Sequence, residues 1–177
     1  MLAERLADYA GFLKFQNLPP EVIHEVKRRV LDSLGCAYGG ITASPCRIAR
    51  RLATRVVFEE GATVWGTRHR TTPELAAFAN GTAVRYLDFN DTYLSKEPAH
   101  PSDNIPACLA VSESLHLHGR RFIQAIVLAY EVQCRLCDAA ALRPRGWDHV
   151  TYGAFSTAIA TAKLLNLSKN QIVQAIN

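Results

Sequence analysis

The chain has 177 residues, of which 49% are hydrophobic and 20% charged, and its formal net charge is +4. This composition is typical of a globular protein and excludes a disordered one. No apolar run reaches the ~18 residues that a membrane span needs, and the arginine pairs are dispersed rather than gathered in a basic stripe. We therefore expect neither a membrane nor a nucleic-acid partner. The five cysteines indicate reduced thiols and a cytoplasmic location.

Apolar residues recur at helical spacing along almost the whole chain. Two helix starts are marked by a proline in the first turn, at Pro20 and at Pro73, where Thr72 precedes as a cap. Residues 62–66 alone are expected to be extended. The helices are expected over residues 2–15, 20–39, 44–56, 73–86, 104–117, 121–142, 151–165 and 168–177. The pattern predicts one all-α domain over residues 1–177, a multi-helix globular domain of about eight helices.

A polar loop joins the fourth and fifth expected helices. Asp88 and Asp91 are three positions apart, so they share a face if the preceding helix continues that far. Two carboxylates held that close repel each other, and one of them gains a raised pKa suited to proton transfer. Thr92 adds a hydroxyl group, and His100 adds an imidazole between stiffening prolines. The loop is therefore a candidate acid–base site.

The start of the fifth helix adds a candidate anion site. Ser102 follows a proline and is expected to cap this helix, whose N-terminus attracts negative charge. Ser102 and Asn104 are therefore predicted to contact the substrate. The alternative is that the Asp, Asn and Ser residues here are only turn and cap residues of a surface loop, which is where these residue types ordinarily occur. His149, before the seventh helix, is likewise either a helix-start residue or a site residue.

The cysteine and histidine residues do not have the spacing of a metal site. Cys134 and Cys137 have C-x-x-C spacing, but they lie inside a helical stretch and lack two further ligands. His116 and His118 are two positions apart and point to different faces of a helix. No metal site and no iron–sulfur cluster is therefore predicted.

Two longer stretches, RYLDFNDTYLSKEPAHPSDNIPA and GWDHVTYGAFSTAIATAKLLNLS, resemble the MmgE/PrpD family, and the similarity covers essentially the whole chain. In that family a helical domain supplies part of the active site, and a following α+β domain closes over the substrate and contributes lysines. The resemblance implies that this chain corresponds to the helical domain and stops before the second one. It also places Asp88, Thr92, His100 and His149 on active-site positions, and it implies a site that works without a metal or other cofactor.

The DFNDT and HPSDN motifs resemble the 2-methylcitrate dehydratase branch. That resemblance implies a lyase of propionate metabolism that eliminates water from a hydroxylated tricarboxylate through an enolate-like intermediate. His100 or His149 would protonate the leaving hydroxyl, and Asp88 would act as base or orienter. Decarboxylation and epimerisation, which the family also carries out, use related carbanionic intermediates. The predicted catalytic residues are Asp88, Asp91, Thr92, His100 and His149.

A second hypothesis makes the chain a non-catalytic helical remnant or subunit that acts as a dimerisation module through its apolar helix faces. The expected partners are a small polycarboxylate, a second copy of the chain, and a second chain or domain that completes the site.

Overall fold

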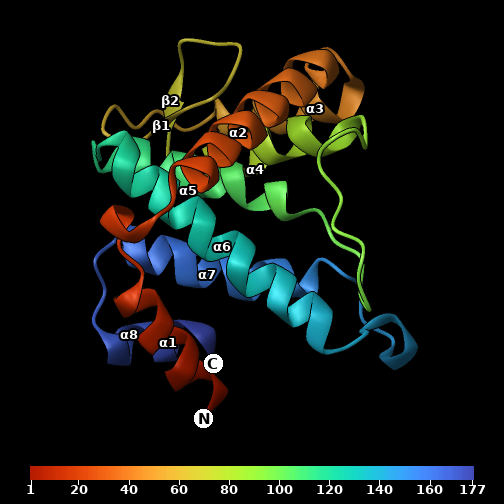
Figure 1. The fold of residues 1–177 in the computed structure, drawn as a ribbon. Coiled ribbons are helices and arrows are strands. Elements are labelled where there is room, and N and C mark those ends of the chain that lie inside the picture. Colours follow the sequence, from red (N-terminus) through yellow and green to blue (C-terminus); the bar gives the residue numbers. More distant parts are fainter.

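The structure is a computed structural model that describes all residues from Met1 to Asn177. Eight α-helices dominate it, and its sheet is one small antiparallel pair of strands (Figure 1), so the all-α prediction is confirmed. The helices are α1 (Leu2–Phe12), α2 (Pro20–Gly40), α3 (Ser44–Ala53), α4 (Pro73–Tyr86), α5 (Asn104–Ser114), α6 (Gly119–Ala139), α7 (Thr151–Leu164) and α8 (Lys169–Ile176). Three 3₁₀ turns are η1 (Phe15–Asn17), η2 (Pro101–Asp103) and η3 (Arg143–Arg145).

The predicted helices all occur, and proline fixes the starts of α2 and α4 as expected. Several helices end earlier than their apolar pattern does. α1 ends at Phe12 because Leu13 is extended, and of the remaining residues of the predicted helix only Phe15 lies in a helical turn, at the start of η1. α3 ends at Ala53 rather than near Val56, and α5 ends at Ser114. Helical periodicity therefore located the helices and the end of α4, but it placed the C-terminal ends of α1, α3 and α5 too late.

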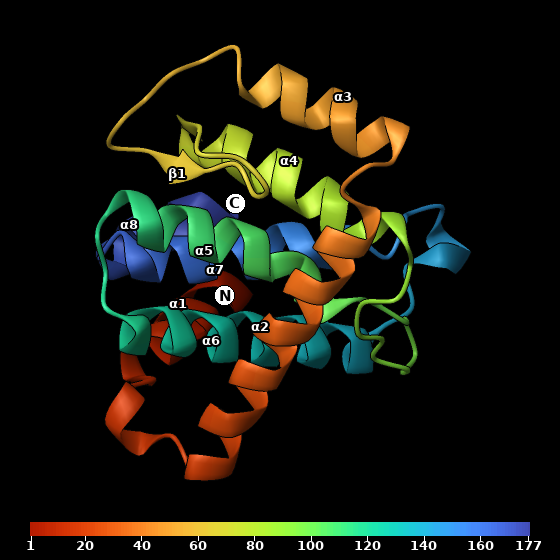
Figure 2. The ribbon, with the colours of Figure 1, turned by 90° about the horizontal axis from the view of Figure 1, so that it is seen from above.

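The helices form successive layers, with α3, α4, α5 and α6 following one another in Figure 2. The main core lies between α5, α6 and α7, where Ile105, Ile126 and Ile159 are fully buried, and α1 and α8 close it from below. Many core residues are alanines, such as Ala125 and Ala129. Because distance between packed helices depends on side-chain size, these small residues allow a close approach. None of the helices is long and apolar enough to cross a bilayer.

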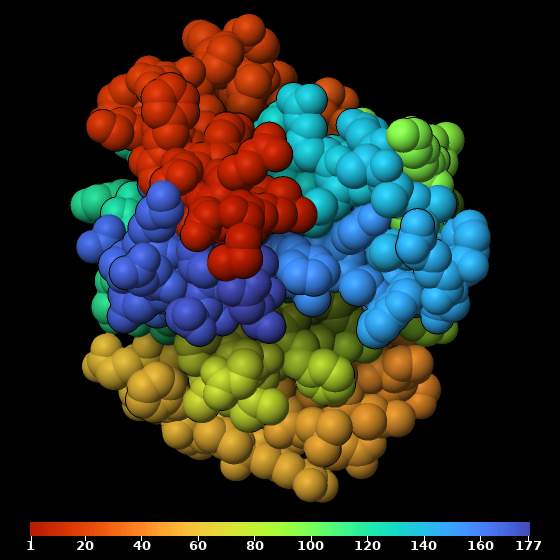
Figure 3. Space-filling model, turned by 90° about the horizontal axis from the view of Figure 1, so that it is seen from below, coloured from red at the N-terminus to blue at the C-terminus, as the bar shows by residue number.

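The two ends of the described chain lie together. Helices α1 and α8 pack side by side, visible as the red and dark blue segments of Figure 3. Asp8 and Lys169 form an ion pair across them at 2.6 Å. Ser168 caps α8, since its hydroxyl accepts from the backbone N–H of Gln171 and the Gln171 side chain accepts from the Ser168 backbone N–H in return.

The extended segment predicted over residues 62–66 is only partly a strand. β1 (Ala62–Thr63) pairs with β2 (Arg70–Thr71). The strand β2 was not predicted from the sequence. Glu113 of α5 holds this pair through an ion pair with Arg70 at 2.9 Å and a hydrogen bond from the Thr63 backbone. The sheet lies on the opposite side of the molecule from the polar loop in Figure 1. It does not position the candidate site.

Candidate active site

The polar loop begins where α4 ends at Tyr86. Asp88 has a φ of 54°, in the left-handed region, and its backbone N–H closes the last turn by donating to the Arg85 carbonyl at 3.1 Å. The helix therefore does not continue to Asp91. The condition under which Asp88 and Asp91 would share a helix face is not met, because the left-handed backbone conformation of Asp88 ends the helix before Asp91.

Arg85, in the last turn of α4, lies at the centre of the polar cluster. Its Nη1 donates to Asp88 at 2.7 Å and to Asn90 at 2.9 Å, and its Nε lies 3.6 Å from an Asp103 oxygen. The buried Asn90 amide in turn donates to Ser102 Oγ at 2.9 Å and to Asp103 at 3.1 Å. Arg85 thus supplies the positive charge that holds two carboxylates of the loop.

Both carboxylate oxygens of Asp91 accept hydrogen bonds from the protein. One carboxylate oxygen accepts from the Ser102 backbone N–H at 2.9 Å, and the other accepts from the Tyr130 hydroxyl on α6 at 2.7 Å. Ser102 itself lies in η2, and the residue before α5 is Asp103, with no side-chain cap. The prediction that Ser102 caps the fifth helix is therefore wrong. Asp91 already occupies the anion position that was expected at this helix start.

His100 is oriented by the same segment. Its Nδ1 lies 2.8 Å from the backbone oxygen of Asp91. Because a carbonyl oxygen only accepts, Nδ1 carries the proton, and Nε2 of the neutral ring is left as an acceptor. Nε2 faces an Asp88 oxygen at 3.8 Å, and the exposed Thr92 hydroxyl lies 3.4 Å from Nδ1. Asp88, Asp91, Thr92 and His100 are therefore brought together.

His149 reaches the same place from the loop between α6 and α7. Gly146 turns this loop with a φ of 79°, and Asp148 closes the next turn by accepting from the Val150 backbone at 3.0 Å. The His149 ring centroid lies 5.8 Å from that of His100, with the two ring planes at 64°. Asp148 lies 2.9 Å from His149 Nδ1, yet neither ring nitrogen makes an aligned hydrogen bond. Both ring nitrogens of His149 are therefore buried without an aligned hydrogen bond.

The two predicted substrate contacts are buried. Ser102 is fully buried beneath Asn90, and Asn104 is 1% exposed. The Asn104 amide donates to Gln133 at 2.6 Å, and its oxygen accepts from Ser156 at 2.8 Å and from Thr157 at 2.7 Å. In this structure both side chains face the protein interior. Their contact with a substrate stays a prediction.

Two carboxyl groups of the cluster have pKa values shifted in opposite directions. The hydrogen bond and charge of Arg85 lower the pKa of Asp88 below its ordinary value. Burial raises the pKa of Asp103 to about 6, although Arg85 opposes that rise. The residue with the raised pKa is therefore Asp103, whereas the spacing argument assigned it to Asp88 or Asp91.

A groove of about 280 Å³ opens between α2 and α6 beside the loop. Its walls are partly apolar, with Val22 and Val26 on α2 and Ile126 on α6, and the polar residues that line it include Glu25, Arg29 and Glu131 as well as Asp91 and Thr92 of the loop. Neither His100 nor His149 lines it. The groove is therefore next to the histidine pair through loop residues that include Tyr93 and Pro101, but the histidines themselves lie outside it.

Residues 1–177 contain no group of three or more His, Cys, Asp or Glu side chains placed to hold a metal ion. The expectation of a site that works without a metal or other cofactor stays an expectation.

Four residues of the cluster were missed, for different reasons. Arg85 precedes Asp88 by three positions, so its i, i+3 spacing on a helix was a usable signal. Tyr130 lies 39 residues from Asp91, and no local pattern connects them. Asn90 and Asp103 were inside the polar loop but could not be distinguished from ordinary turn residues.

Comparison with known proteins places the whole chain in one family. The model of the MmgE/PrpD N-terminal domain matches residues 4–177. The mitochondrial 2-methylcitrate dehydratase of Yarrowia lipolytica is 30% identical over 96% of this chain and 35% of its own length. The 2-methylcitrate dehydratase of Salmonella typhimurium is 30% identical over 84% of this chain and 33% of its own length.

A relative with another activity name is equally similar. The cis-aconitate decarboxylase of Homo sapiens is 32% identical over 99% of this chain and 38% of its own length. The chain therefore spans about a third of the length of the curated relatives that it matches.

Proposed function

The chain belongs to the MmgE/PrpD family, and on that premise we propose that it supplies the histidine part of the active site of a lyase of the 2-methylcitrate dehydratase type. The observation that carries the proposal is the placement of His100 and His149, whose rings approach to 5.8 Å from two separate loops. Two imidazoles at this separation can serve one small substrate, one accepting a proton and the other donating one.

The proposed reaction is elimination of water from a hydroxylated tricarboxylate. A proton leaves the carbon next to a carboxylate, and its bonding electrons form the double bond while the β-hydroxyl leaves as water. His100 suits the base, because its bond to the Asp91 carbonyl leaves Nε2 free to accept. His149 suits the acid that protonates the leaving hydroxyl, since its ring nitrogens have no aligned partner in the protein.

Asp88 suits an orienting role better than that of a base. Arg85 holds its pKa low, so its carboxylate is a weak proton acceptor. At 3.8 Å from His100 Nε2 it can still stabilise the imidazolium that forms when the base is protonated. Thr92 is proposed to hold a substrate oxygen with its exposed hydroxyl.

The enolate-like transition state needs further positive charge. Arg85 is the cation of this cluster, and it is already bonded to Asp88 and Asn90. We therefore propose that additional cations come from the part of the relatives' length that this chain does not span. Two large apolar side chains on the site loop, Phe89 and Leu94, are 82% and 81% exposed, which fits a covering domain or partner there.

Two other functions have specific support. The similarity to a human cis-aconitate decarboxylase supports decarboxylation, which passes through a related carbanion. The exposed Phe89 and Leu94 also fit the second hypothesis, in which the chain is a non-catalytic interaction module that dimerises with a second copy of itself.

Turnover by the purified 177-residue chain tests the proposal. With 2-methylcitrate as substrate, the conjugated alkene product is followed by ultraviolet absorbance, and a parallel assay follows CO₂ release from cis-aconitate. We expect H100A and H149A each to lower the rate by about 100-fold or more, as removal of an acid or base does. H24A, which changes an exposed histidine on α2, is the matched control. Absence of turnover by the intact chain would favour the interaction module.

A further inference from the structure

Glu97 is a buried carboxylate that the proposed reaction does not use. It lies in the loop between α4 and η2, and its side chain is 1% exposed. A buried carboxylate is costly unless donors of the protein hold it. Its partners therefore indicate what it does.

The donors come from a different loop. Glu97 Oε2 accepts from the backbone N–H of Leu142 at 2.5 Å and from that of Arg143 at 3.2 Å. Arg143 also places its Nε 3.3 Å from Oε1, although Oε1 accepts no aligned hydrogen bond. Both donors lie at the start of η3, in the loop that connects α6 to α7 and carries His149.

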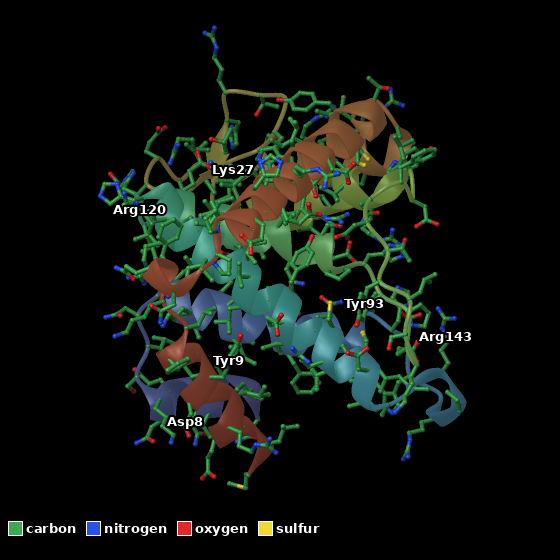
Figure 4. The ribbon with its side chains drawn as sticks, in the orientation of Figure 1. Asp8, Tyr9, Lys27, Tyr93, Arg120 and Arg143 are labelled. Atoms are coloured by element: carbon green, nitrogen blue, oxygen red, sulfur yellow. The ribbon has the colours of Figure 1, made fainter.

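Each loop is also closed on itself. Tyr93 and Ala99 exchange two backbone hydrogen bonds, at 2.8 and 3.0 Å, on either side of Glu97. The backbone of Trp147 donates to the Leu142 carbonyl at 3.4 Å, which folds the second loop back toward His149. Figure 4 shows Tyr93 and Arg143, one from each loop, at the same end of the molecule.

The other side-chain hydrogen bonds of this region hold only one loop. The Tyr93 hydroxyl donates to Asp138 on α6 at 2.9 Å, and the Tyr152 hydroxyl on α7 donates to the Ala140 carbonyl at 3.0 Å. Among the hydrogen bonds of this region, those of the Glu97 carboxylate are the ones that join the His100 loop to the His149 loop.

We propose that Glu97 is a positioning residue, which sets the separation of the His100 and His149 rings by joining the two loops that carry them. It contacts neither ring, so it acts through the backbone of both loops. The predicted effect of Glu97 on turnover rests on the proposed function. The predicted effect of Glu97 on the placement of the two rings does not depend on any reaction.

The length of the side chain, rather than its charge, is decisive in this account. Gln has the same length and keeps an oxygen that can accept from Leu142 and Arg143. Asp keeps the charge but is one methylene shorter, so it cannot reach the second loop while the Glu97 backbone N–H stays bonded to the Cys137 carbonyl. The Arg143 side chain is 61% exposed and can turn toward solvent when the charge is removed.

The test compares E97Q with E97D in the 177-residue chain, with E74Q on the exposed start of α4 as control. Histidine-ring NMR signals report ring placement, and kcat and KM for 2-methylcitrate report catalysis. We expect E97D to displace the ring signals of His100 and His149 but not those of His24. We also expect it to lower kcat by about 10-fold or more with KM within about twofold, because small misplacements of catalytic groups mainly slow the reaction. E97Q should stay near the wild type in both measurements.

The opposite order, with E97D near the wild type and E97Q impaired, would overturn the positioning role in favour of a charge effect. Unchanged ring signals in E97D would overturn it as well. Displaced ring signals in E97D, together with wild-type rates of 2-methylcitrate turnover in H100A and H149A, would support the positioning role while contradicting the proposed function. Circular dichroism checks folding. If E97D does not fold, E97Q decides the matter, because displaced ring signals there would contradict the proposal.

Discussion

Asp103 is a carboxyl group whose ionisation opposes folding. Burial raises its pKa from 3.8 to about 6, so the folded state holds this proton more tightly than the unfolded chain does. Its contribution to the free energy of unfolding is therefore fully present below about pH 4 and is lost as the pH rises through about 6. The shift corresponds to at most about 3 kcal/mol. We expect D103N to remove this pH dependence.

Denaturant unfolding at pH 4.5, 6.0 and 7.5 measures the effect. The difference in unfolding free energy between D103N and the wild type should increase toward high pH. D32N, which removes the same charge from an exposed position on α2, is the control and should leave the slope unchanged. Parallel pH profiles for D103N and the wild type would show that Asp103 stays ionised throughout.

Residues of the candidate site could be predicted from the sequence when they lie in one short segment of the chain. Asp88, Thr92 and His100 lie in one loop, and their residue types alone indicated acid–base chemistry. Asp103 could not be chosen over Asp88, because its raised pKa depends on burial beneath packed helices. Glu97 gave no signal either, since its partners lie 45 and 46 residues further along the chain.

At the level of the elements, Asn104 links three of them. Its amide donates to the Pro101 carbonyl in η2 and to Gln133 on α6, and its oxygen accepts from Ser156 on α7. Removing it leaves buried polar partners without hydrogen bonds, which costs about 2 to 3 kcal/mol. We expect N104A to lose that much stability in chemical unfolding, while N170A on the exposed surface of α8 should lose less than about 0.5 kcal/mol. A loss below about 1 kcal/mol in N104A would mean that water or a neighbour replaces the amide.

Helix positions were predictable because periodicity, proline and cap residues act within one turn. The starts of α2 and α4 follow from Pro20 and Pro73 alone. The start of α5 at Asn104 also agrees with the prediction, but the predicted cap does not, because η2 precedes the helix and Asp91, from outside it, takes the N–H of Ser102. β2 was missed because two residues are too short for an alternating pattern.

At the scale of the molecule, the two loops that carry the histidines meet at one end of the helical layers (Figure 1). The curated relatives are about three times as long as this chain, so the helical domain accounts for one part of their length. The single-domain organisation, the homodimer, the completing domain or chain and the cytoplasmic location stay predictions. Whether the chain turns over substrate alone depends on how much of the site His100 and His149 form without further cations.

The central claim is that His100 and His149 form one binding site for a hydroxylated tricarboxylate. Titration of the 177-residue chain with 2-methylcitrate, observed through the histidine-ring NMR signals, tests it directly. We expect the signals of both rings to shift with one common midpoint, while those of the exposed His24 do not move. Shifts with two different midpoints, or no shift of either ring at saturating ligand, would contradict the account.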